Sequence, residues 1–159
     1  MKRTLFLFLI TFAALIIYAQ SSKEVKKLKI KTIIETNTIG DKTLNEKKTV
    51  FDKNGDETEE TDYNKEGLIK KVTKYKRNAD GKVIEEAEYN AKNELKEKRT
   101  ATFNKMGEKI EELFYDANSK LVKKYKIVYN AQGLKTEKQI YDGTGKLTET
   151  KKFQYEYFK

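Results

Sequence analysis

The sequence predicts an all-β fold, an antiparallel meander of repeated β-hairpins that forms a largely single-layer twisted sheet or an open solenoid. Three observations lead to this prediction. A turn motif recurs at alternating spacings of 12 and 14 residues, and the 7–9 residues between turns are rich in Thr, Val, Ile and Tyr. Leu, Ile, Val and Phe supply only 28 of the 140 residues in 20–159. That share would fill the core of a two-layer sandwich poorly.

Residues 1–19 are expected to be a secretory signal peptide. A basic start at Lys2 and Arg3 precedes an apolar run over 4–18, and the small Ala19 is followed by polar residues. The run is shorter than the roughly 20 residues that span a bilayer, which favours cleavage near Ala19 over the alternative, a retained membrane anchor. We therefore expect an exported protein, periplasmic, extracellular or on the cell surface, with no transmembrane segment after cleavage.

The turn motif is an aromatic residue, then Asp or Asn, two further residues and Gly. Its full copies begin at Phe51, Tyr63, Phe103, Tyr129 and Tyr141. Weaker copies begin at Arg77, Tyr89 and Tyr115, and one more step reaches Tyr155. Two steps give a period of 26 residues in four copies, preceded by a degenerate unit over 36–40. We expect a lead-in and first strand over 20–35 and a β-hairpin repeat domain over 36–159.

Each motif suits a type I turn closed by a G1 bulge. The Asn or Asp side chain can accept a hydrogen bond from the backbone two residues on, and Gly can take a positive φ. The expected turn glycines are Gly55, Gly67, Gly81, Gly107, Gly133 and Gly145. Nine to eleven strands follow. The alternative, a helix, fits best over 91–99 and 108–113, where Glu and Lys are dense.

The recurrent aromatic position is the candidate binding surface. Both steps are even, and side chains alternate along a strand with period 2, so we expect this position to stay on one face and form cross-strand ladders near the turns. The candidate residues are Tyr63, Tyr89, Tyr115, Tyr129, Tyr141 and Tyr155. A purely structural ladder and a ligand platform are both open.

The amino-acid composition excludes most common types of catalytic site. The chain has no Cys and no His, which excludes a cysteine nucleophile, a histidine base and a Cys/His zinc site. Carboxylate pairs such as Glu59-Glu60 recur with the hairpins, whereas an active site is built once. The segment Asp52–Asp56 has oxygen ligands at alternate positions, as calcium loops do, but a plain turn is the favoured interpretation. We expect no enzyme, and no catalytic, cofactor-binding or metal-binding residue.

The repeated motif, as in Tyr63-Asn64…Gly67, resembles the YD (RHS-type) repeats of bacterial surface proteins. It is also similar to the short-hairpin repeats of MORN-like and antitoxin-like exported proteins. The resemblance covers about residues 36–157. MORN units carry more glycines at a shorter period, and RHS shells are far longer. The resemblance implies an exported hairpin-repeat protein and carries no catalytic residue onto this chain.

The net charge of the chain limits the classes of binding partner that we expect. Without Lys2 and Arg3, 32 basic and 25 acidic residues remain, a net charge of +7. The charges are interleaved, as on a solvated surface, and export separates the chain from the chromosome. We expect a surface or envelope module that binds cell-surface polysaccharide or another protein, or forms a structural element, with no nucleic acid as partner. The alternative is an antitoxin or immunity-type interaction module.

Overall fold

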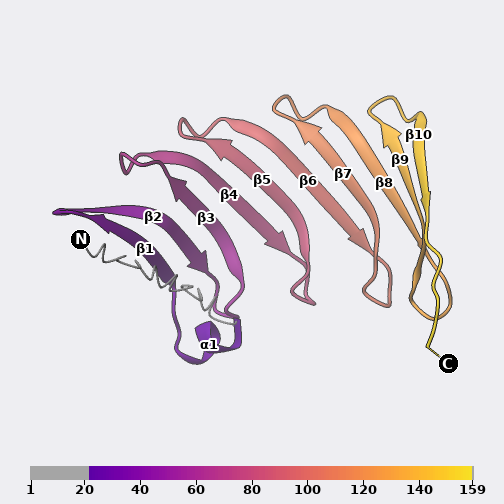
Figure 1. Ribbon diagram of the computed structural model, residues 1–159, viewed down its shortest axis with the longest axis horizontal. Coiled ribbons are helices and arrows are strands. Elements are labelled where there is room, and N and C mark those ends of the chain that lie inside the picture. The colour runs from indigo at the N-terminus through magenta and orange to yellow at the C-terminus, as the bar shows by residue number, and fades with distance from the viewer. Residues whose placement is uncertain (1–21, 159) are drawn as a thin grey trace, which may run out of the picture.

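The computed structural model describes residues 22–158 as one open, ten-stranded antiparallel sheet. The strands follow one another in chain order, so every neighbour in the sheet is a neighbour in the sequence. Figure 1 shows the strand direction turning steadily from β1 to β10, with these two strands at opposite ends. The prediction of an all-β, single-layer hairpin meander is confirmed. The expected signal peptide over 1–19 lies outside the described residues.

The strands have similar lengths and short connections. Their bounds are β1 Thr32–Ile39, β2 Lys42–Phe51, β3 Glu57–Tyr63, β4 Ile69–Arg77, β5 Val83–Asn90, β6 Leu95–Phe103, β7 Lys109–Asp116, β8 Leu121–Tyr129, β9 Lys135–Asp142 and β10 Leu147–Lys152. The two segments where a helix was the alternative contribute to β6 and β7. The expected boundary at 35/36 falls inside β1, which ends at Ile39 rather than at Glu35.

The eight turns from β2 to β10 share one construction. Asn64 shows it: its Oδ1 accepts hydrogen bonds from the amides of Glu66 (3.0 Å) and Leu68 (2.9 Å), and its carbonyl accepts one from Gly67 (2.9 Å). The same side-chain bonds recur at Asp52, Asn78, Asn90, Asn104, Asp116, Asn130 and Asp142. The bulge position has positive φ even where it is Asn93 (61°) or Ser119 (60°). The predicted turn type is confirmed in full and weak copies alike.

The register corrects one expectation. Tyr63 pairs with Ile69, but Asp62 pairs with Lys71, so Lys70 is an extra residue one pair beyond the turn. Beyond this extra residue, residues that pair across neighbouring strands, and so share a face, are therefore separated by an odd number of residues in the sequence. An even step of 12 or 14 moves the aromatic position to the opposite face, and only the 26-residue step returns it. The expectation of one constant face is wrong.

Little of the chain is buried, as a single layer requires. Among residues 22–158, the buried side chains are those of Val25 (1 % exposed), Thr73 (4 %), Ala87 (5 %) and Thr61 (5 %). Ala87 lies directly between Lys74 and Lys98 of the adjacent strands. Long lysine stems can cover such small residues while their ammonium groups stay in water. Cross-strand side-chain contacts thus replace a second layer.

The described chain begins with a short helix, α1 (Ser22–Lys27), which lies beside the β2–β3 turn (Figure 1). Its one apolar residue, Val25, is the most deeply buried side chain described. An added Cβ at Gly55 would lie 2.2 Å from the Ser22 carbonyl oxygen, so helix and turn are in close backbone contact. No sequence motif predicted this helix. In residues 22–158, no helix is long and apolar enough to cross a membrane.

Candidate functional site

The strand register sorts the side chains into two faces of different character. The first, named here the lysine–tyrosine face, contains Ala87 and the residues in register with it. Its charged residues in register are Lys48, Lys74, Lys76, Lys98, Lys124, Lys126 and Lys152, with Glu59, Glu85, Glu111 and Glu137. Seven lysines against four glutamates make this face cationic.

Four tyrosines line one edge of the lysine–tyrosine face. They follow one another at the 26-residue period and lie at or one residue before the ends of β3, β5, β7 and β9: Tyr63, Tyr89, Tyr115 and Tyr141. Because they lie on alternate strands, a distance of about 10 Å separates each from the next, too far for ring stacking. The predicted direct ladder of rings is therefore replaced by a row in which lysines from the intervening strands stand between tyrosines.

Each of the last three tyrosines has a lysine ammonium over its ring. Lys74 Nζ lies 5.1 Å from the ring centroid of Tyr89, and Lys98 Nζ lies 4.9 Å from that of Tyr115. Tyr141 has two, Lys126 at 5.8 Å and Lys124 at 6.0 Å. Such cation–π contacts hold the ammonium groups in place without neutralising them.

Most of these lysines have no carboxylate partner. In the described chain, ion pairs on this face join Lys76 to Glu85 (2.7 Å) and Lys124 to Glu111 (3.1 Å). No ion pair within 22–158 involves Lys74, Lys98 or Lys126, whose ammonium groups contact tyrosine rings instead. Their charge is available to a ligand.

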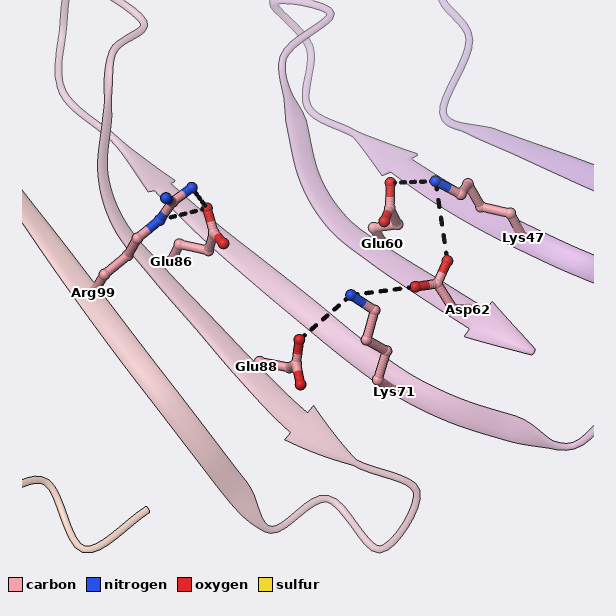
Figure 2. A network of polar contacts seen from close by, with 7 residues as sticks. All are labelled: Lys47, Glu60, Asp62, Lys71, Glu86, Glu88 and Arg99. Atoms are coloured by element: carbon pink, nitrogen blue, oxygen red, sulfur yellow. Dashed lines mark hydrogen bonds and ion pairs between the residues drawn. The ribbon is translucent and has the colours of Figure 1, made fainter. Parts of the chain in front are cut away.

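The opposite face, named the paired-charge face, contains Glu86 and its register partners. Figure 2 shows its network: Lys47 contacts Glu60 (2.9 Å) and Asp62 (4.0 Å), and Lys71 contacts Asp62 (3.4 Å) and Glu88 (3.3 Å). On β6, Arg99 donates hydrogen bonds to Glu86, and the distance from Arg99 Nε to Glu86 Oε2 is 3.0 Å (Figure 2). Arg99 also approaches Glu112 of β7 (3.9 Å). The contacts of Lys47 and Lys71 link β2 to β5, and those of Arg99 link β5 to β7. Lys47, Lys71 and Arg99 are thus already neutralised, so the part of this face from β2 to β6 offers an anion little.

The network shifts the ionisation of its lysines. A hydrogen bond from Lys47 to Glu60 is the main reason why the pKa of Lys47 is raised. Burial alone would lower the pKa of Lys71, but its hydrogen bond to Glu88 and the charges of Glu88 and Asp62 outweigh burial, and the pKa is raised. Both ammonium groups therefore stay charged to a higher pH than free lysine does.

A second polar cluster on this face surrounds Tyr75. Burial, followed by the charges of Glu57 and Glu60, raises the pKa of Tyr75 to about 12. Burial, and next the charge of Glu60, also raises the pKa of Glu57, whose Oε1 is buried without a hydrogen-bond partner. The cluster costs stability at neutral pH, because a poorly solvated carboxylate is held beside a second one.

Toward β8 and β9 the paired-charge face becomes aromatic. The rings of Phe114 and Tyr125 meet edge to face, with centroids 4.8 Å apart and planes at 65°. Lys138 Nζ lies 3.6 Å from the Tyr125 centroid, and Lys123 Nζ lies 5.7 Å from it. The turn motif did not indicate this pair, because neither residue belongs to it. The cross-strand register alone brings them together.

The six predicted candidate tyrosines do not form one site. Tyr63, Tyr89, Tyr115 and Tyr141 lie on the lysine–tyrosine face. Tyr129 falls on the opposite face, where its hydroxyl bonds the Lys109 carbonyl (3.0 Å), and Tyr155 makes the equivalent bond to Lys135 (2.6 Å). These last two hydroxyls serve the fold, and the candidate site contracts to four tyrosines with their lysines.

The carboxylate pairs named from the sequence are separated by the sheet. Glu59 and Glu60 are adjacent in β3, and their side chains point to opposite faces. The pairs at Glu85-Glu86 and Glu111-Glu112 are separated in the same way. Within the part of the chain that the structure describes, no three His, Cys, Asp or Glu side chains gather as a metal site would require. Asp52 accepts the bonds of an ordinary turn.

Comparison with known proteins adds no family. No protein-family model and no curated protein matches the chain. Two solved structures align over 80 % of this chain with a TM-score of 0.44: a Bacteroides fragilis protein of unknown function (15 % identity, 96 % of that chain) and a porin-like protein from Bacteroides uniformis (12 % identity, 51 % of that chain). TarM aligns at a TM-score of 0.33 with 19 % identity, covering 80 % of this chain and 22 % of its own. None of these scores assigns a function.

Proposed function

We propose that this protein is an exported, non-enzymatic repeat module that binds an anionic partner of the cell envelope or cell surface through its lysine–tyrosine face. The observation that carries the proposal is the row of lysines held over tyrosine rings without carboxylate partners, at Lys74, Lys98 and Lys126. Repeat proteins present extended surfaces of this kind to their partners.

Two further features support a binding role outside the cell. The basic, apolar and small-residue pattern over 1–19 is typical of a secretory signal peptide. The carboxylate pairs named from the sequence are divided between the two faces of the sheet, so none of these adjacent pairs can act together as acid and base.

The test is retention of the protein, residues 20–159, on an isolated bacterial envelope fraction. The informative variant combines Lys74→Gln, Lys98→Gln and Lys126→Gln. The matched control combines Lys53→Gln, Lys65→Gln and Lys105→Gln, which removes the same charge from exposed turns. We expect retention by the parent protein and the turn variant and its loss in the face variant. No retention of the parent protein at low salt, or equal loss in both variants, contradicts the proposal.

A further inference from the structure

We propose that the ligand of the lysine–tyrosine face is a linear acidic polysaccharide that lies across the strands and carries one anionic group on every second sugar. This inference rests on the proposed function and names the chemistry of the partner. It follows from the spacing of the cations, the hydrogen-bonding groups between them and the narrow width of the cationic strip.

The spacing of the cations follows that of the tyrosines. Lys74, Lys98 and Lys126 do not share one position of the repeat, but each ammonium group lies over a tyrosine ring that does. Tyr89, Tyr115 and Tyr141 lie on alternate strands, each with its lysine above the ring. With strands about 4.8 Å apart, the cationic positions recur roughly every 10 Å along the sheet. Two sugar units of an extended polysaccharide cover a comparable length. In a polysaccharide with one carboxylate or sulfate per disaccharide, each anionic group would therefore meet the lysine ammonium group of one 26-residue repeat.

Hydrogen-bonding groups fill the space between the cations. The middle of the face presents hydroxyl or amide side chains at Thr100, Gln139 and Thr150, in register with the lysine strands. Along the tyrosine edge, the hydroxyls of Tyr63, Tyr89 and Tyr115 make no hydrogen bond within residues 22–158, whereas Tyr141 donates to Gln139 (2.5 Å). Sugar hydroxyls, unlike lipid tails, can use such donors and acceptors.

The cationic strip is narrow. Glu59, Glu85, Glu111 and Glu137 form a parallel row on the same face, four residues from the tyrosines along each odd-numbered strand. That separation is about 13 Å at the usual rise per residue. Lys74 and Lys126 stand directly opposite Glu59 and Glu111 in the register, and their ammonium groups reach from that row to the tyrosine rings. A single polysaccharide chain that follows the tyrosine row meets the ammonium groups over the rings, and the glutamate row lies to one side of it. A DNA duplex or a flat anionic membrane is wider than the strip and would also meet the row of negative charge.

The test measures binding of residues 20–159 to four immobilised polymers of matched length by biolayer interferometry. Hyaluronan carries one carboxylate per two sugars, polygalacturonate carries one per sugar, dextran carries none, and duplex DNA supplies a non-saccharide polyanion. Each is measured with the parent protein, the Lys74/Lys98/Lys126→Gln variant and the turn-lysine control. Circular dichroism confirms that the variants keep the sheet.

We expect hyaluronan to bind most tightly and dextran not at all. The face variant should lose roughly tenfold or more in affinity for hyaluronan, and the turn control about twofold or less, since only the face lysines release counterions at the site. Equal or tighter binding of polygalacturonate or DNA overturns the periodicity inference, while the proposed function survives if the face variant is still the defective one. Equal losses in the two variants overturn both.

Discussion

The Tyr129 hydroxyl donates a hydrogen bond to the Lys109 backbone carbonyl, 20 residues earlier in the chain (3.0 Å). The same offset recurs twice. Tyr155 bonds the Lys135 carbonyl (2.6 Å), and Arg77 Nε donates to the Glu57 carbonyl (3.2 Å). Each bond ties the end of an even-numbered strand, or the segment that follows β10, to the start of the preceding odd-numbered strand. The repeat therefore carries its own clamp between neighbouring strands, on the face opposite the candidate site.

Removing or adding one clamp hydroxyl should change stability in opposite directions. Tyr129→Phe should destabilise the sheet by about 1 kcal/mol, the usual net contribution of one hydrogen bond. Phe103 occupies the equivalent position without a hydroxyl, so Phe103→Tyr can donate to the Val83 carbonyl and should stabilise by a similar amount. Urea unfolding followed by circular dichroism measures both. Destabilisation by Phe103→Tyr would show that the clamp is not transferable between repeats.

The turn positions make a second matched set. Ser119 holds a φ of 60° in a place where most copies of the motif have Gly, so Ser119→Gly should stabilise by about 1 kcal/mol through relief of left-handed strain. Gly145→Ala, with nothing within 4 Å of the added Cβ, should cost about the same amount. Gly55→Ala adds a clash with α1 and should cost more than Gly145→Ala. Equal costs at Gly55 and Gly145 in thermal unfolding would contradict the contact between helix and turn.

The sequence predicted the turns, the strand number and the open single layer, because Asx side chains and left-handed glycines are local signals. It did not predict the register. Lys70, the extra residue beside the Tyr63 turn, looks like any other strand residue, yet it moves the next aromatic position to the other face. The helix α1 was missed because six residues without a repeat leave no periodic signal. Its stability comes from burial of Val25.

The sequence predicted that the candidate site is a row of tyrosines, but it did not predict which of the six tyrosines share a face. The recurrent tyrosine position was visible in the sequence, but the lysine partner of each tyrosine depends on cross-strand pairing. Lys98 is 17 residues before Tyr115 and directly opposite it, a relation that only the register supplies. The ion pairs of the paired-charge face follow the general preference of opposite charges for cross-strand positions, but the register decides which residues pair.

The contribution of Glu57 to the free energy of unfolding should depend on pH in the acidic range. The folded pKa of Glu57 is raised above the ordinary 4.5, so the folded state binds this proton more tightly than the unfolded chain does. The group favours folding below the unfolded pKa, and that contribution is lost as pH rises through the folded value. Glu57→Gln should therefore stabilise at pH 7 by a few tenths of a kcal/mol after solvent screening, with no gain below about pH 4.

The control for this prediction is Glu66→Gln, which removes the same charge from an exposed turn. Unfolding in urea at pH 3.5 and pH 7 gives the comparison. A gain from Glu57→Gln that is equal at both pH values, or matched by Glu66→Gln, would argue against a strained carboxyl at this position.

Alkaline pH should weaken the paired-charge face. The folded pKa values of Lys47 and Lys71 are raised above the ordinary 10.5. Their contribution is complete below the unfolded pKa and is lost as pH rises through the higher folded values. The double variant Lys47→Arg, Lys71→Arg should keep its thermal midpoint to higher pH, since guanidinium stays charged. If the thermal midpoint falls equally in the parent protein and the variant as pH rises, the two lysines do not cause the alkaline loss of stability. Tyrosine ionisation is then the competing cause.

The openness of the sheet is tested most directly by spin-label distances, which the absence of cysteine makes convenient. Nitroxides at Asn37 and Thr150 report the separation of β1 and β10, and labels at Lys74 and Lys126 report four strand steps within the sheet. At about 4.8 Å per step, the inner pair should lie near 19 Å, and the outer pair, nine steps apart, much farther, approaching 43 Å. An outer distance equal to or shorter than the inner one would show a closed or curled sheet and contradict the open face on which binding depends.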